Sequence, residues 1–213
     1  MEALLAFAAA LLALRLAGRL AGRWRIRRAP ELAAWSASLL AYAVAAAALA
    51  WGASAGWNET AFRVYYLFGG LLTAPLLGAG SLLLLGRRWV IPVVLVYSGL
   101  AVGASIAEPL SAGVGGSAIP EAQEHLDYFP LRILAIVGNL AGTFAVAGVA
   151  VATIRRRPLG TALILAGVGV AAAGSALAGL GVAQTAAFLA IGSAFLYGGF
   201  TISSGNRQVS LPG

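Results

Sequence analysis

The sequence has no lysine and no cysteine, and each absence removes a class of chemistry. A Schiff base to retinal or to a carbonyl substrate needs a lysine amine, so retinal is excluded as a cofactor. Without cysteine the chain has no disulfide, no thiolate nucleophile, no iron–sulfur cluster and no cysteine ligand for a metal. The redox compartment therefore cannot be read from cysteine usage.

Histidine occurs once, as His125. Catalytic zinc normally takes three protein ligands, usually with more histidine than this. Acidic residues stand near His125 in the sequence, but we expect a loop histidine that is solvated or salt-bridged. The chain also lacks the multi-histidine zinc pattern of the seven-helix ceramidases and adiponectin-receptor hydrolases. We predict no cofactor, no metal site and no catalytic residues.

Charge is scarce as well, since 10% of the residues are charged and 61% are hydrophobic, with a mean hydropathy of +0.90. A soluble domain carries about 25% charged residues. The formal net charge of +7 does not indicate nucleic acid, because the arginines flank apolar runs, as in the cytoplasmic loops of membrane proteins. We therefore expect the chain to lie in a lipid bilayer.

Long apolar runs fill most of the 213 residues. A transmembrane helix needs about 20 predominantly apolar residues. We predict an all-α, polytopic membrane bundle of seven transmembrane helices in a single domain, with a polar outer loop at 108–129. The predicted spans are 2–22, 31–53, 61–86, 89–107, 130–154, 159–180 and 183–203.

The charges predict the orientation of this bundle. Twelve of the fourteen arginines lie on one side of the spans and six of the seven acids on the other, so the positive-inside bias places the N-terminus outside and the C-terminus in the cytoplasm. Among the twelve, Arg15, Arg19 and Arg23 recur every four residues and share one helix face, from which they can snorkel to the interface. We expect a bacterial cytoplasmic membrane.

Two arginines remain on the outer side, Arg63 and Arg132, each near the start of its helix. A charge near the hydrocarbon is usually paired or faces a cavity. One interpretation is an electrostatic latch between the outer loop and the helix ends, and the other is a pocket for a polar or anionic ligand. The candidate ligand-binding residues are Arg63, Arg132, Glu59, Tyr66, Asp127 and Asn139.

Polar residues inside the spans are few. Asn139 lies about two turns into the fifth span, and an amide in lipid seeks a partner on another helix. Pro75 and Pro92 are expected to kink the third and fourth spans. Small residues recur at a spacing of four, which favours close helix packing, either within the bundle or between two copies of the chain. They are Gly70/Ala74/Gly78, Gly99/Gly103, Gly138/Gly142 and Ser175/Gly179.

Two segments carry a resemblance: 57–85, WNETAFRVYYLFGGLLTAPLLGAGSLLLL, and 130–142, PLRILAIVGNLAG. They resemble a group of bacterial seven-helix membrane proteins without an established activity. The second and third spans are similar to the seven-helix sensor modules that precede histidine kinases. No kinase follows here before Gly213, so the sensor resemblance implies a partner protein.

The predicted function is therefore a non-enzymatic membrane protein with a polar outer-face site, either sensor-like or an accessory subunit of a membrane complex. A small-solute transporter is the first alternative, because spans one to three and five to seven repeat one orientation, as in the three-plus-one-plus-three layout of sugar-transporting SWEET proteins. An enzyme acting at the outer face is the second alternative. A small polar or anionic molecule, a membrane protein partner or a second copy are the expected partners, and nucleic acid is not.

Overall fold

The computed structural model describes residues 2–110, 113–116 and 118–153. The chain forms two compact units, 1–145 and 146–213. The described helices belong to the first unit, and the last of them continues to Thr153. The described residues are helical or lie in turns and loops, and none of them forms a strand.

The helices run in the order expected from the apolar runs. The first two are α1 (Glu2–Arg27) and α2 (Pro30–Ala55). The next three, α3 (Glu59–Tyr65), the π-helical η1 (Tyr66–Leu72) and α4 (Thr73–Leu84), follow without a break. Then come α5 (Val90–Ala107), the short α6 (Ala122–His125), the π turn η2 (Tyr128–Arg132) and α7 (Ile133–Thr153).

Five of the resulting segments are long and apolar enough to cross a membrane: Ala3–Arg27, Pro30–Ala55, Glu59–Leu84, Val90–Ala107 and Tyr128–Thr153. They coincide with the first five predicted spans within a few residues. The predicted spans 159–180 and 183–203 lie outside the described residues, as do the arginines beyond residue 154 that support the predicted orientation. We use "outer end" for the end that carries residues 108–129, after that prediction.

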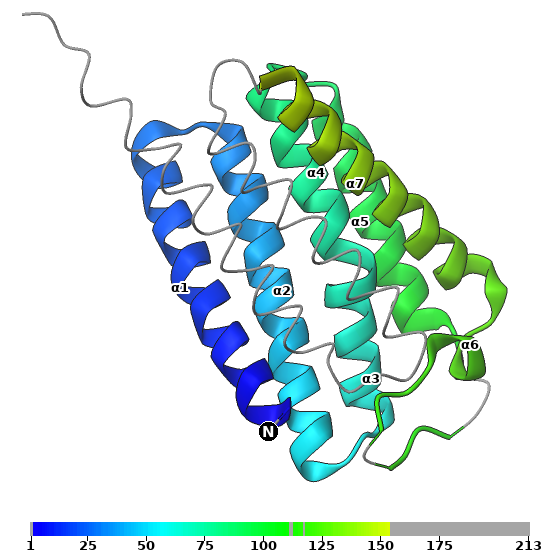
Figure 1. Ribbon diagram of the computed structural model, residues 1–213. Coiled ribbons are helices and arrows are strands. Elements are labelled where there is room, and N and C mark those ends of the chain that lie inside the picture. The colour runs from blue at the N-terminus through cyan, green and yellow to red at the C-terminus, as the bar shows by residue number, and fades with distance from the viewer. Residues whose placement is uncertain (1, 111–112, 117, 154–213) are drawn as a thin grey trace, which may run out of the picture. The chain divides into compact units, whose positions relative to one another are not determined.

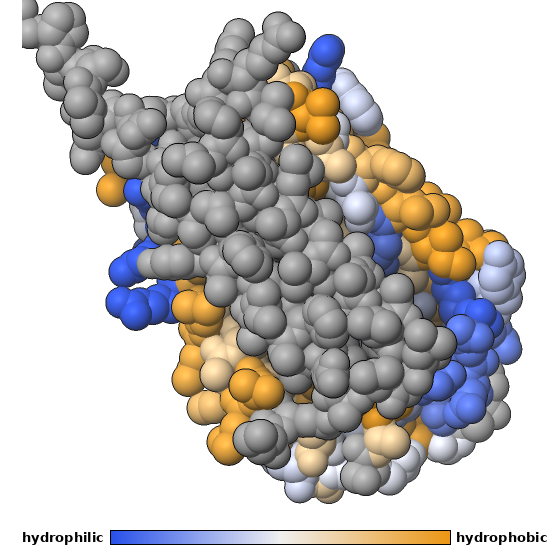
Figure 2. Space-filling model, viewed as in Figure 1, coloured by the Kyte–Doolittle hydropathy of each residue, from blue (hydrophilic) through white to orange (hydrophobic). Residues whose placement is uncertain are grey.

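Figure 1 shows α1, α2, the α3–η1–α4 rod and α5 as a row of neighbouring helices. Alanine lines the face of α1 that packs against α2, with Ala6, Ala13 and Ala17 all buried. The Ser36 hydroxyl on α2 donates to the Ala17 carbonyl across this contact, at 2.9 Å. Figure 2 shows apolar side chains along the visible flanks of the described helices, and hydrophilic ones around α6 and on the α1 side.

Glycines bring α4 and α7 into backbone contact. A Cβ added to Gly78 would stand 2.7 Å from the Cα of Gly142, and one added to Gly142 would overlap the Ala74 carbonyl. The interpretation that these small residues serve packing within the bundle is confirmed here. On α5, by contrast, a Cβ at Gly99 or Gly103 would meet nothing within 4 Å, and the pair Ser175/Gly179 lies outside the described residues.

The end of the first helix was predicted wrongly. The helix continues beyond Gly22 to Arg27, so the basic stretch expected as a loop is mostly helical. Arginine is a good helix former, and cations in the last turn stabilise the negative end of the helix dipole. Arg28 then ends the helix at a φ of 51°, and its N–H donates to the Trp24 carbonyl at 2.7 Å.

Candidate functional site

The outer end of α3 is fixed by a local cap and by one arginine. The Asn58 side chain accepts a hydrogen bond from the Ala61 N–H at 2.9 Å, which satisfies a donor at the start of the helix. One turn later, Arg63 donates through Nη1 to the Ser105 carbonyl at 2.8 Å and to the Glu108 carbonyl at 2.8 Å. Both acceptors lie at the C-terminal end of α5, where carbonyls lack partners and the helix dipole is negative. Arg63 therefore caps α5.

Glu108 extends this contact to the outer loop. Its carboxylate is buried, with 7% of the residue exposed, and accepts hydrogen bonds from the Asp127 N–H at 3.1 Å and the Leu131 N–H at 3.4 Å. Burial is the largest influence on its pKa, which lies above the ordinary value, while the two backbone donors and Arg63 act in the opposite direction. We call Arg63, Glu108, Asp127 and Leu131 the outer latch, because together they join α3, α5 and the start of α7.

Aromatic side chains pack beside the latch. The Phe62 ring, 1% exposed, lies 6.0 Å from the Tyr66 ring and 5.5 Å from the His125 imidazole in an edge-to-face arrangement. The backbone N–H of Trp57 donates to the Gly116 carbonyl at 2.8 Å. The loop and α6 are thereby held against the outer end of α3, and His125 is part of this packing. In the described ranges no group of three or more histidine, cysteine or acidic side chains could hold a metal ion.

Arg132 differs from Arg63 in how its guanidinium is used. It stands over the Tyr128 ring at 5.4 Å, and within the described part of the chain it has no hydrogen bond and no ion pair. Tyr66 stacks on the Phe62 ring, one turn after Arg63 on the same rod. Glu59 is exposed and has no polar side-chain contact with other described residues. Of the predicted site residues, Arg63 and Asp127 are hydrogen-bonded to Glu108, and Arg132 directly follows Leu131, whose N–H donates to the Glu108 carboxylate.

Deeper along the same rod, the π-helical segment 66–72 has carbonyls that would accept a backbone N–H in a regular α-helix and here accept side-chain groups. The Thr73 hydroxyl donates back to the Phe68 carbonyl at 2.7 Å, and the Ser38 hydroxyl on α2 donates to the Thr73 carbonyl at 2.7 Å. Hydroxyl groups thus satisfy backbone acceptors that a bilayer interior could not.

Pro75 explains part of this irregularity, since proline has no N–H to offer the Leu71 carbonyl one turn earlier. The Tyr97 hydroxyl on α5 lies 3.0 Å from that carbonyl and 3.0 Å from the Leu134 carbonyl of α7. It has a single proton, so it donates to one of the two at a time. Gly138 is required beside it, because a Cβ there would overlap the hydroxyl.

Asn139 belongs to this deeper region. Its amide Nδ2 donates to the Gly70 carbonyl at 2.6 Å and to the Ala135 carbonyl of its own helix at 2.8 Å. The expected bond from Asn139 to another helix is therefore present. Gly70 follows Arg63 by seven residues, about 10 Å along a helix, so Asn139 is not a direct neighbour of the outer latch.

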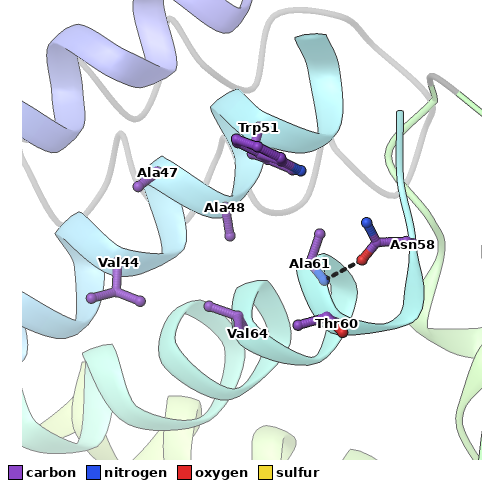
Figure 3. Close-up of a pocket in the computed structure, with 8 residues that line it drawn as sticks. All are labelled: Val44, Ala47, Ala48, Trp51, Asn58, Thr60, Ala61 and Val64. Atoms are coloured by element: carbon purple, nitrogen blue, oxygen red, sulfur yellow. Dashed lines mark hydrogen bonds between the residues drawn. The ribbon is translucent and has the colours of Figure 1, made fainter. Parts of the chain in front are cut away.

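A shallow groove of about 530 Å³ opens between the outer ends of α2 and α3. Its walls are mainly apolar, and neither Arg63 nor Arg132 lines it (Figure 3). The residues that line it are Val44, Ala47, Ala48, Trp51, Asn58, Thr60, Ala61 and Val64.

The sequence did not single out Glu108 ahead of the other acids. A signal was present: an acid directly before Pro109, at the negative end of a helix, is unfavourable unless other groups bind it. Comparison with protein-family models, curated proteins and solved structures found no match to the chain. The resemblance to bacterial seven-helix proteins and sensor modules therefore stays a prediction.

Proposed function

We propose that the chain is a non-enzymatic multi-pass protein of a bacterial cytoplasmic membrane that binds a polar or anionic ligand at its outer face, as a sensor-like protein or an accessory subunit. One observation carries this proposal: the guanidinium of Arg132 is half-buried and is supported by the Tyr128 ring alone among the described residues. Such a group keeps its hydrogen-bond donors for a carboxylate or phosphate, which arginine binds in a bidentate manner.

A ligand bound at Arg132 would act on the helix ends through the outer latch. Arg132 immediately follows Leu131, whose N–H is bound by the Glu108 carboxylate, while the Glu108 carbonyl is bound by Arg63 of α3. An anion at Arg132 adds a negative charge close to a buried carboxylate, and like charges at short range in a poorly solvated site repel. The ligand would therefore bias the latch that joins three helix ends.

Native mass spectrometry of the protein extracted gently from its own membrane tests this proposal. We expect a reproducible small-molecule adduct that is lost in Arg132→Gln and kept in the matched variant Arg25→Gln, at the opposite end of the helices. A stoichiometric protein companion that is lost in Arg132→Gln and kept in Arg25→Gln, without a small adduct, would select the accessory-subunit form, with an acidic group of the companion as the ligand. An adduct that survives in Arg132→Gln, or no adduct and no companion, would refute the proposal.

A small-solute transporter is the second candidate, and the π segment with Pro75 supports it. Transporters often place their substrate at interrupted helices near the middle of the bilayer. Here side chains of α5 and α7 bind carbonyls of the π segment, and one of α2 binds the carbonyl of Thr73 directly after it. Solute uptake into vesicles that is abolished by Asn139→Leu in a folded protein would favour this candidate over a receptor.

A further inference from the structure

The first helix presents a cationic face near the end opposite the outer latch. Its buried residues, such as Ala13, Leu16 and Leu20, face α2, whereas Arg15 and Arg19 are exposed. These two arginines are four residues apart, so their side chains lie one above the other on the helix. Figure 2, in the view of Figure 1, shows hydrophilic side chains that project on the α1 side.

The contact with α2 fixes how deep Arg15 lies. Ser36 bonds to the Ala17 carbonyl, so these two residues lie at the same depth. Glu31 is the last charged residue before the long apolar run of α2, five positions before Ser36, and Arg15 lies two positions before Ala17 on the antiparallel α1. At 1.5 Å per residue along both helices, Arg15 therefore lies about 10 Å further into the apolar layer than Glu31. The apolar stretch before it, Ala3–Leu14, covers only about 18 Å of a hydrocarbon core of about 30 Å.

A guanidinium at this depth needs a counter-charge. Charged side chains at membrane depth snorkel toward the interface and draw water and lipid headgroups inward. Two arginines one helical turn apart can grip one phosphate, because each guanidinium is a planar fork of donors. The surrounding segment 15–31 carries six arginines and a single acid, Glu31, which favours a lipid with net negative charge over a zwitterionic one.

We infer that Arg15, with Arg19 one turn away, forms a binding site for the phosphate of an anionic phospholipid that is drawn below the level of the neighbouring headgroups. This site lies away from the outer latch and is independent of the function proposed above. A lipid is the occupant that fits, because Arg15 and Arg19 are exposed side chains within a helix that is long and apolar enough to span a membrane.

Native mass spectrometry from micelles doped with equal amounts of phosphatidylglycerol and phosphatidylcholine tests the site in the full chain. We expect a phosphatidylglycerol adduct whose affinity falls further in Arg15→Gln than in Arg25→Gln. The matched control Arg25→Gln removes an exposed arginine in the last turn of the same helix and should lose only the roughly fivefold share that any one arginine near an anionic lipid surface supplies, whereas Arg15→Gln also loses the bidentate contact to the phosphate.

Equal phosphatidylglycerol binding by Arg15→Gln and Arg25→Gln would overturn the inference, and so would equal binding of the two lipids by the wild type. Displacement of the lipid by millimolar inorganic phosphate would also overturn it, since it would indicate a simple anion site. If Arg15→Gln fails to fold, Arg15→Lys keeps the charge and removes the fork. Undiminished phosphatidylglycerol binding by that variant would count against a bidentate phosphate site.

Discussion

The close contact between α4 and α7 predicts that Gly142→Ala lowers the free energy of unfolding. In Gly142→Ala the new methyl group would overlap the carbonyl of Ala74 and stand 3.0 Å from the Pro75 nitrogen. These are backbone atoms, which cannot swing aside as the end of a flexible side chain can. Overpacking of this kind costs about 1–3 kcal/mol, whereas alanine in place of glycine in a helix otherwise gains about 0.5–1 kcal/mol.

Gly148→Ala is the matched control on the same helix, because a Cβ there meets no atom within 4 Å. Both variants gain the same helix propensity, so the difference between their free energies of unfolding isolates the steric cost, about 1–3 kcal/mol. Titration of the protein in mixed micelles with dodecyl sulfate, followed by circular dichroism, measures that difference. If Gly142→Ala unfolds at the same dodecyl sulfate fraction as Gly148→Ala or a higher one, the described backbone contact does not limit stability and the reasoning fails.

Three further substitutions test the latch and the deeper polar contacts. Because burial raises the pKa of the Glu108 carboxyl, the stability that its protonated form contributes is complete below the ordinary value and is lost as pH rises through the raised one. Thermal unfolding against pH should show this loss in the wild type and not in Glu108→Gln, and a wild-type stability that instead rises with pH over this window would contradict it. Arg63→Met leaves two α5 carbonyls without their donor and should lower the free energy of unfolding by about 1.5–3 kcal/mol; hydrogen exchange of the backbone near Glu108 that stays as slow as in the wild type would count against a capping role. Asn139→Leu removes the bond to Gly70 and should cost about 1 kcal/mol in the same micelle titration, so an unchanged midpoint would mean that this bond adds no net stability.

The spans themselves could be predicted from the sequence because the thickness of the bilayer sets how many consecutive apolar residues a spanning helix needs. The helix start predicted at 31 lies one residue from Pro30, where α2 begins. The start predicted at 61 lies two residues after Glu59, because the capping role of Asn58 was not recognised. Helix ends in basic stretches were harder, because arginine suits both a helix end and a loop, and α1 continues to Arg27 for that reason.

The polar contacts were predicted less well. One interpretation of Arg63 was an electrostatic latch to the outer loop, but Arg63 binds two carbonyls and the carboxylate of Glu108 binds two N–H groups. Every residue has the same backbone N–H and C=O groups (proline lacks the N–H), so the sequence does not show which of them lack a hydrogen-bond partner. That depends on where neighbouring helices end. The π segment was hidden for the same reason, since its apolar residues are ordinary and Pro75 was the one local sign of it.

The π segment also changes how this span should respond to insertions and deletions. A π turn closes its hydrogen bonds one residue later than an α turn, so segment 66–72 holds a residue that a regular helix of the same reach would omit. Deleting one residue there would let the rod close as a continuous α-helix while α3 and α4 keep their present faces. The same deletion in α2 or α5 would rotate every later residue of that helix by about 100°. Segment 66–72 is thus a place where a one-residue deletion would leave the helix packing on either side in register. It would remove the carbonyl sites that the π turn creates, while the carbonyl four residues before Pro75 would still lack its N–H donor.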